Sequence, residues 1–104
     1  MEHRLKNNAS FFNLLVNSDK SQKRALLDTV SQEQADFVAE LLHNFIHSFP
    51  IPTAEKKKLA RKKIFADVIN LKRSYKFRKG KIKKCKKEII LLIEKYNKQL
   101  KSLL

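Results

Sequence analysis

Apolar residues recur along this chain at intervals of three and four positions, the spacing that one face of an α-helix requires. The first cluster covers residues 11–16, and Ser10 before it is a candidate N-cap. A helix over this cluster is expected to end just before Asp19. Either Asp19 or Ser21 can then cap a second short helix, which runs through Leu27. The N-terminal part of the chain therefore predicts two short helices.

Ser31 opens the helix with the clearest sequence signals. Gln34 stands three residues later, so the two side chains can form a capping box over the first turn. Pro50 and Pro52 end the helix, because proline lacks a backbone donor and disfavours a helical residue before it. Between these limits one wide apolar face carries Phe37, Val38, Leu41, Leu42, Phe45, Ile46 and Phe49.

Two more helices are predicted in the second half of the chain. Thr53 is a candidate N-cap for a helix over residues 54–72. Residues 74–80 alternate aromatic and basic side chains and end in the only glycine, so they are expected to break the helical pattern. A long basic helix over 81–103 follows, about 35 Å in length. With so little Gly and Pro for hairpin turns, the pattern predicts an all-α fold, a compact bundle of four to five helices with a long basic C-terminal helix.

The last predicted helix has an apolar seam close to a heptad a/d series. Its turn from Ile89 to Ile93 is apolar on every side, so it must be covered from more than one direction. Other helices of the bundle or a second copy of the chain could provide that cover. We favour the bundle, and a homodimer through this helix stays open. The seam comprises Ile82, Cys85, Ile89, Leu92, Tyr96 and Leu103.

The 104 residues predict a single helical domain, and its charge is divided unequally. Residues 1–50 hold five Lys and Arg against six Asp and Glu, a net charge of −1. Residues 51–104 hold nineteen against four, a net charge of +15. A near-neutral half at 9–50, expected to supply most of the core, thus precedes a strongly basic half at 51–104. Such asymmetry raises self-repulsion unless an anionic partner relieves it.

The basic residues form two blocks, 56–63 and 72–87, on consecutive predicted helices. Packing these helices side by side would merge their positive fields, and Tyr75 and Phe77 could stack on bases or, equally, anchor their segment to the core. Lys exceeds Arg in both blocks, which favours contacts with phosphates over bidentate reading of guanine. The candidate nucleic-acid-binding residues are Lys56, Lys57, Lys58, Arg61, Lys62, Lys63, Lys72, Arg73, Tyr75, Lys76, Phe77, Arg78, Lys79, Lys81, Lys83, Lys84 and Lys87.

Other chemistry has little support in the sequence, so we expect no enzymatic activity, no cofactor and no metal. His43 and His47 lie four residues apart near Glu40, but the HExxH pattern is absent, and they are interpreted as polar residues beside an apolar face. Cys85 occupies a seam position and is expected in the core. A lone cysteine suits a reducing compartment, and neither a secretory signal nor about 18 continuous apolar residues for a membrane span is present. An intracellular protein is expected.

Several short motifs resemble a known family. They are Phe12-x-x-Leu15, Lys23-Arg24-Ala25-Leu26-Leu27-x-Thr29-Val30-Ser31, Glu40-Leu41-Leu42-x-Asn44-Phe45, and Ile51-Pro52 followed by Glu55-Lys56-Lys57-Lys58-Leu59. Over about residues 11–88 this order resembles the small basic proteins of Maverick/Polinton elements and of related adintovirus- and adenovirus-like DNA viruses. The resemblance implies a virion- or core-associated protein in a DNA-packaging setting. The family's Gly-Gly and Leu/Pro-rich tail is replaced here by Gly80 and a lysine-bearing segment.

These observations lead to the hypothesis of sequence-tolerant binding to double-stranded DNA, for packaging or condensation in the host nucleus or in a virion. Two alternatives are kept. One is a helical interaction protein, such as a capsid cement or scaffold adaptor, whose basic side chains contact an acidic protein partner. The other is an RNA-binding helical module.

Overall fold

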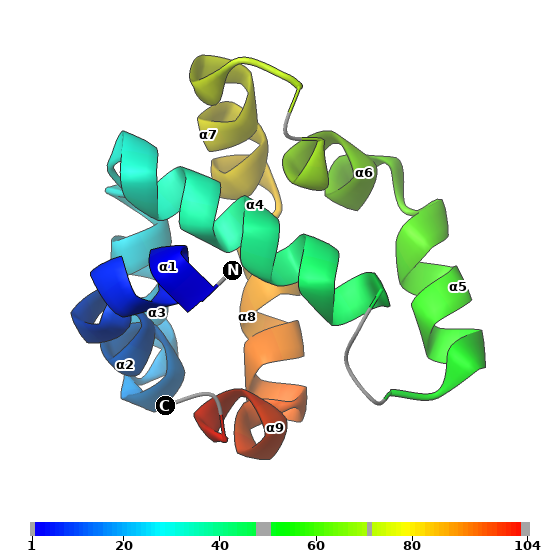
Figure 1. Ribbon diagram of the computed structural model, residues 1–104, viewed down its shortest axis with the longest axis horizontal. Helices are drawn as coiled ribbons and strands as arrows, with labels where there is room; N and C mark the ends of the chain where they lie inside the picture. Colours follow the sequence, from blue (N-terminus) through cyan, green and yellow to red (C-terminus); the bar gives the residue numbers. More distant parts are fainter. Residues whose placement is uncertain (1, 48–50, 71, 103–104) are drawn as a thin grey trace.

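The computed structural model of the chain describes residues 2–47, 51–70 and 72–102. Within these ranges the chain is all-helical, which confirms the predicted fold class, but it is divided into nine helices where four to five were predicted (Figure 1). The Cα radius of gyration is 12.5 Å, as expected of a compact chain of this length. The helices are α1 (Glu2–Asn7), α2 (Ala9–Asn17), α3 (Lys20–Asp28), α4 (Gln32–His47), α5 (Thr53–Arg61), α6 (Lys63–Ile69), α7 (Tyr75–Lys84), α8 (Lys86–Lys95) and α9 (Asn97–Lys101).

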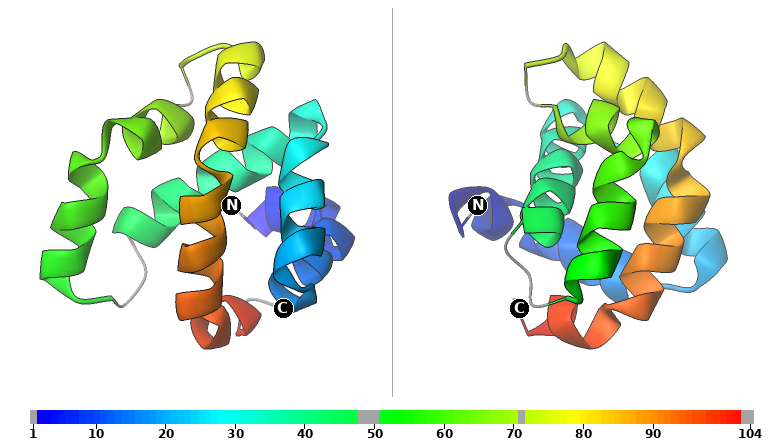
Figure 2. Two further views of the ribbon diagram at one scale, coloured as in Figure 1. Left: turned by 180° about the vertical axis from the view of Figure 1, so that it is seen from behind. Right: turned by 90° about the vertical axis from the view of Figure 1, so that its right-hand side faces the viewer.

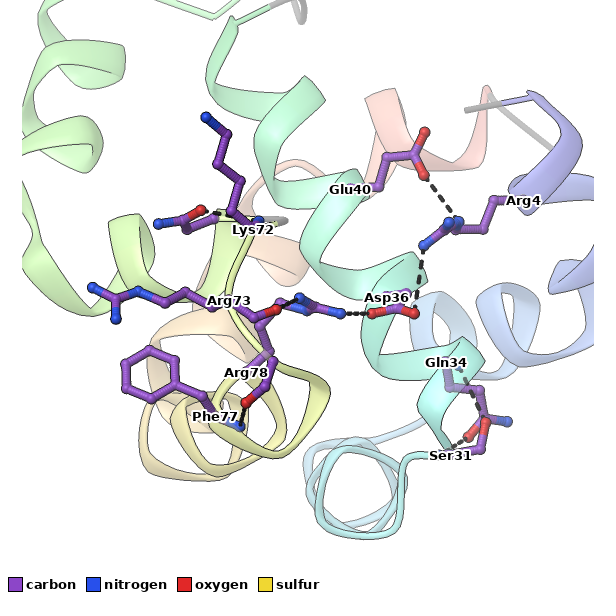
Figure 3. Close-up of polar contacts among 11 residues, drawn as sticks. Arg4, Ser31, Gln34, Asp36, Glu40, Lys72, Arg73, Phe77 and Arg78 are labelled. Carbon is purple, nitrogen blue, oxygen red and sulfur yellow. Dashed lines mark hydrogen bonds and ion pairs between the residues drawn. The ribbon is translucent and has the colours of Figure 1, made fainter.

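Two of the predicted helix caps are confirmed. Asp19 caps α3, where its carboxylate accepts the Gln22 N–H at 2.8 Å and its own N–H donates to the Gln22 side chain at 3.3 Å. Ser31 and Gln34 form the same reciprocal pair at the start of α4, at 3.2 and 2.9 Å (Figure 3). Each pair satisfies backbone donors that a helix start otherwise leaves unbonded. Ser10 is not an N-cap, because α2 begins at Ala9 and Ser10 therefore lies inside the helix.

The prediction of one helix over 54–72 is wrong, because the chain bends at Lys62 and forms α5 and α6 instead. The bend has a packing cause. Leu59 and Val68 are both buried, yet at nine residues apart they would lie on opposite sides of a straight helix. The extended backbone of Lys62, with φ −73° and ψ 113°, lets both helices pack against α4 (Figure 1). Thr53 is the first residue of α5 rather than its N-cap.

The prediction that residues 74–80 break the helical pattern is also wrong. Ser74 caps α7, its hydroxyl accepting the Phe77 N–H at 3.3 Å, and the helix runs on through Gly80. The alternation of aromatic and basic side chains favours extended structure locally. The cap and the packing of Tyr75 against the core outweigh that preference.

The predicted single helix over 81–103 is instead made of segments, with turns at Cys85 and Tyr96. Backbone hydrogen bonds bridge the first turn, since the Cys85 N–H donates to Lys81 and the Ile89 N–H donates to Cys85, each at 3.0 Å. The two helices follow each other along one line in the left-hand view of Figure 2 and meet at a bend in the right-hand view. At the second turn the chain changes direction, and α9 packs against α2.

The apolar seam of α7 and α8 faces the interior. In the turn from Ile89 to Ile93, four residues are buried and Leu91 is 52% exposed. α3 runs alongside α8 and covers part of this turn, so helices of the same chain account for the burial (Figure 2). Leu103 of the predicted seam lies outside the described residues. The buried seam residues are Ile82, Cys85, Ile89, Leu92 and Tyr96.

One hydrophobic core joins both halves of the chain. α4 crosses the middle of the molecule, with α7 and α8 behind it in the view of Figure 1 and α5 and α6 beside it. Phe12 and Phe37 meet near edge-to-face, with ring centroids 5.6 Å apart, and Phe65 and Ile82 of the basic half are fully buried. The basic half therefore contributes nearly as much of the core as residues 9–50, which is more than the sequence pattern predicts.

A network of charges ties α7 and α1 to α4 (Figure 3). The Arg78 side chain is only 7% exposed, and its guanidinium donates to the Asp36 carboxylate and to the Arg73 carbonyl. Arg4 also lies beside Asp36, with Nη1 3.9 Å from Oδ2, and its Nε is 3.0 Å from Glu40 Oε2. Because arginine stays charged in proteins, the burial of Arg78 depends on this carboxylate.

The substitution Asp36→Ala should lower the free energy of unfolding by about 3 kcal/mol, because the Arg78 guanidinium then stays buried without its carboxylate. Urea unfolding followed by circular dichroism measures the change. Glu33→Ala removes an exposed carboxylate from the same helix and should cost about 0.5 kcal/mol. Equal losses in the two variants would contradict the importance of the Asp36–Arg78 pair.

The substitution Gly80→Ala should raise the free energy of unfolding by about 0.5–1 kcal/mol. Gly80 is an exposed position inside α7, and nothing lies within 4 Å of the place where a Cβ would stand. Urea unfolding again gives the value. A loss of stability would mean that residue 80 is not helical in solution.

Candidate nucleic-acid interface

The structure brings most of the predicted binding residues to the surface of α5 to α8 and their connections. Arg78 is the exception, since it is buried against Asp36. Five members of the set are half-buried: Lys56, Tyr75, Phe77, Lys79 and Lys81. The exposed members are Lys57, Lys58, Arg61, Lys62, Lys63, Lys72, Arg73, Lys76, Lys83, Lys84 and Lys87.

α7 and α8 present an outward stripe of lysines. Lys76, Lys83 and Lys87 follow at helical spacing on the side away from the buried Ile82 and Ile89, and Lys84 adjoins them. At 1.5 Å per residue, the stripe from Lys76 to Lys87 would be about 17 Å long on a straight helix, and the turn at Cys85 makes this an upper bound. That length corresponds to about five phosphates along one DNA strand, at 3.4 Å of rise for each. We call these four lysines the α7–α8 stripe.

A groove separates α5 from α8, and it brings lysines of the first basic block to face α8. We call it the α5–α8 groove. Its floor is apolar, formed by the buried Leu59, Phe65 and Leu92, and the exposed Leu91 also lines it. Its rim carries Lys58, Lys62, Lys95, Glu55 and Glu88.

A second groove, between α3 and α8, contains basic residues that the sequence analysis missed. Lys20 and Arg24 of α3 lie here with Lys87, beside Ile90 and Leu91. The two α3 residues belong to the near-neutral half, so charge counting along the chain passes over them. Their i, i+4 spacing places them on one helical face, but only the packing of α3 along α8 brings that face beside Lys87. We call this the α3–α8 groove.

Four Lys and Arg residues of the basic half form ion pairs with carboxylates in the part of the chain that the structure describes. Two of them, Arg78 and Lys81, belong to the predicted binding set. Because a carboxylate of the same molecule already compensates their charge, we leave both out of the candidate contact surface. The pairs are Arg78–Asp36, Lys81–Asp67 at 3.5 Å, Lys86–Asp28 at 2.9 Å and Lys95–Glu55 at 2.6 Å.

The two aromatic residues of the predicted set have partners within the molecule. Tyr75 packs against the core, and Lys79 Nζ lies 5.5 Å from its ring centroid. The Arg73 guanidinium lies 5.0 Å from the ring centroid of Phe77 (Figure 3). Lys81 Nζ lies 5.3 Å from the same centroid. Such cation–π contacts hold these side chains in place on α7. The arrangement favours the anchoring role of Tyr75 over base stacking.

The remaining chemically distinctive residues have structural surroundings. Cys85 is fully buried, as predicted, and burial with the nearby charge of Glu88 raises the pKa of its thiol to about 12. His43 and His47 are exposed, with ring centroids 4.6 Å apart. Among the described residues no group of three or more His, Cys, Asp and Glu side chains could hold a metal ion. Nor is any helix in the described ranges long and apolar enough to cross a bilayer.

Glu55 ties the start of α5 to the end of α8. Its carboxylate accepts hydrogen bonds from Lys95 Nζ at 2.6 Å and from the Tyr96 hydroxyl. These two hydrogen bonds lower the pKa of Glu55 below its usual value. Burial, together with the hydrogen bond to Glu55, raises the pKa of Tyr96 to about 12. The contact therefore fixes one end of the α5–α8 groove when Glu55 is ionised and Tyr96 is protonated.

The substitution Glu55→Gln should weaken the dependence of stability on acid pH. A carboxylate with a lowered pKa in the folded protein contributes stability above its ordinary pKa, and this contribution is lost as the pH falls through the folded value. The unfolding temperature of Glu55→Gln should thus lie below wild type at about pH 6, and the gap should narrow toward about pH 3. Thermal unfolding monitored by circular dichroism tests this, with Glu33→Gln as control. A gap independent of pH would contradict the ion pair.

Comparison with protein-family models, with curated proteins and with solved structures gives no match to this chain. Function therefore has to be argued from the chemistry and the geometry of the chain itself.

Proposed function

We propose that the protein binds double-stranded nucleic acid, DNA by preference, through the phosphate backbone. The observation that carries the proposal is the α7–α8 stripe, four exposed lysines at helical spacing for which the described residues provide no carboxylate partner. Lys58 of α5 lies beside α8 on one side, and Arg24 of α3 lies beside it on the other. A surface of this kind is suited to the regular negative charge of a duplex.

Lysine dominates this surface, which favours binding that tolerates any sequence. A lysine ammonium is a compact point charge, whereas guanine is read most often by the bidentate guanidinium of arginine. Of the exposed members of the predicted set, Arg61 and Arg73 are the arginines, and Arg73 already lies over the ring of Phe77. Contacts to phosphates position a protein on DNA without selecting sequence.

The overall charge supports a polyanionic ligand. The chain carries a net charge of +14. Within the described residues, only four of the nineteen Lys and Arg residues of the basic half form ion pairs with carboxylates. Binding a polyanion would relieve the repulsion that remains. A role in packaging or condensing DNA, in a virion or a mobile element, follows from the motif resemblance described above. This role requires no enzymatic activity.

Binding to a mixed-sequence DNA duplex should weaken about a thousandfold or more between 50 and 200 mM salt, if six to ten phosphates are engaged. Fluorescence anisotropy with a labelled duplex gives the slope of log K against log salt. Replacing Lys83, Lys84 and Lys87 with Gln should make that slope shallower by about three, one for each lost phosphate contact. Lys6→Gln is the control, because α1 lies on the side of the molecule away from α8 (Figure 2).

A nearly flat salt response would contradict phosphate binding, and an unchanged slope in the triple variant would remove the α7–α8 stripe from the interface. Competition at fixed salt between duplex DNA, duplex RNA and single strands separates the DNA proposal from the RNA-binding alternative. A strong preference for one duplex sequence would contradict sequence-tolerant binding.

A further inference from the structure

Leu91 stands out on the surface of α8. It is 52% exposed, while the residues on either side of it in sequence, Ile90 and Leu92, are buried. Leu91 lines both the α5–α8 groove and the α3–α8 groove, so it forms an apolar ridge between two depressions. Exposed leucines are common, but this one continues into the apolar floor of the α5–α8 groove, where Leu59 and Phe65 also lie.

Basic residues border this apolar strip on both sides. Lys58 and Lys62 stand on the rim of the α5–α8 groove, and Arg24 and Lys87 line the α3–α8 groove together with Lys20, whose Nζ lies 3.9 Å from Glu94 Oε2. The carboxylates of the first groove offset this charge only in part. Glu55 is engaged by Lys95 and Tyr96, so among the residues that line this groove Glu88 is the carboxylate that remains to offset Lys58 and Lys62. The surface around Leu91 is therefore apolar at its centre and positive at its edges.

From this arrangement we infer a docking site for an acidic amphipathic helix of a protein partner. An apolar side chain of the partner would lie against Leu91 and the floor of the α5–α8 groove, and its Asp or Glu residues would meet Lys58, Lys62 and Lys87. A second copy of the chain is a poorer occupant, because pairing through α8 would place these like charges against each other. Duplex DNA is a poorer occupant because phosphates gain nothing from an apolar floor.

Selection from a display library of random peptides of about 15 residues, long enough for four helical turns, tests the inference. The immobilised bait is the wild-type protein, and binders are counter-selected on Leu91→Ser. This variant keeps every charge and changes one exposed side chain, so peptides attracted by charge alone are removed. Enriched peptides should combine apolar residues at i, i+3 or i+4 with Asp and Glu, and should bind Leu91→Ser about tenfold or more weakly. Replacing Lys58 and Lys62 with Gln should weaken them about threefold to tenfold.

Each other outcome overturns the proposal. Failure of any peptide to discriminate wild type from Leu91→Ser would show that the ridge is not a docking site, and enrichment of peptides without acidic residues would exclude the acidic partner. Self-association in sedimentation experiments that is lost in Leu91→Ser would assign the ridge to a second copy. Duplex DNA binding, measured in parallel, should be the same in Leu91→Ser and wild type. A loss there would assign Leu91 to the nucleic acid, whereas failure of the DNA proposal alone would leave the peptide result unaffected.

Discussion

Arg78 carries a permanent charge into the interface between α7 and α4, where the Asp36 carboxylate compensates it. A buried guanidinium without a counter-charge costs several kcal/mol, so α7 can dock on α4 only in the register that brings the two groups together. Ile82, one turn further along α7, enters the core in that same register. The position of α7 then limits that of α8, because only Cys85 separates the two helices and backbone hydrogen bonds to Lys81 and from Ile89 bridge it.

This docking decides which Lys and Arg side chains have their charge compensated by a carboxylate and which stay available to a partner. Lys86 and Lys87 are adjacent in sequence, yet Lys86 reaches Asp28 on α3 at 2.9 Å while Lys87 lines the α3–α8 groove. A rotation of 100° per residue around the helix is enough to separate the two roles. Lys83 and Lys84 lie on the outer side with Lys87. Asp28 and Asp36 of the near-neutral half thus compensate Lys86 and Arg78 on the inner side of α7 and α8, whose outer side stays charged.

Features that depend on a few neighbouring residues could be predicted from the sequence, and features that depend on distant contacts could not. The caps at Asp19 and Ser31 need only a partner three residues away, so they were readable. The bend at Lys62 arises because α5 and α6 must both reach α4, which no local pattern records. The same reason explains the site. Clustered lysines were visible in the sequence, but the burial of Arg78 and the approach of Arg24 to α8 follow from packing.

The two proposed modes of binding differ in the force that drives them. Lysines of the α7–α8 stripe are separated by about 6–10 Å, comparable to the Debye length of about 8 Å at physiological ionic strength, so salt screens their mutual repulsion only in part. A polyanion would remove that repulsion, and the gain would shrink as salt rises. Leu91 lies in the same face, but covering it removes apolar surface from water, which does not depend on charge screening. Added salt would therefore release a duplex from this face sooner than a partner that covers Leu91.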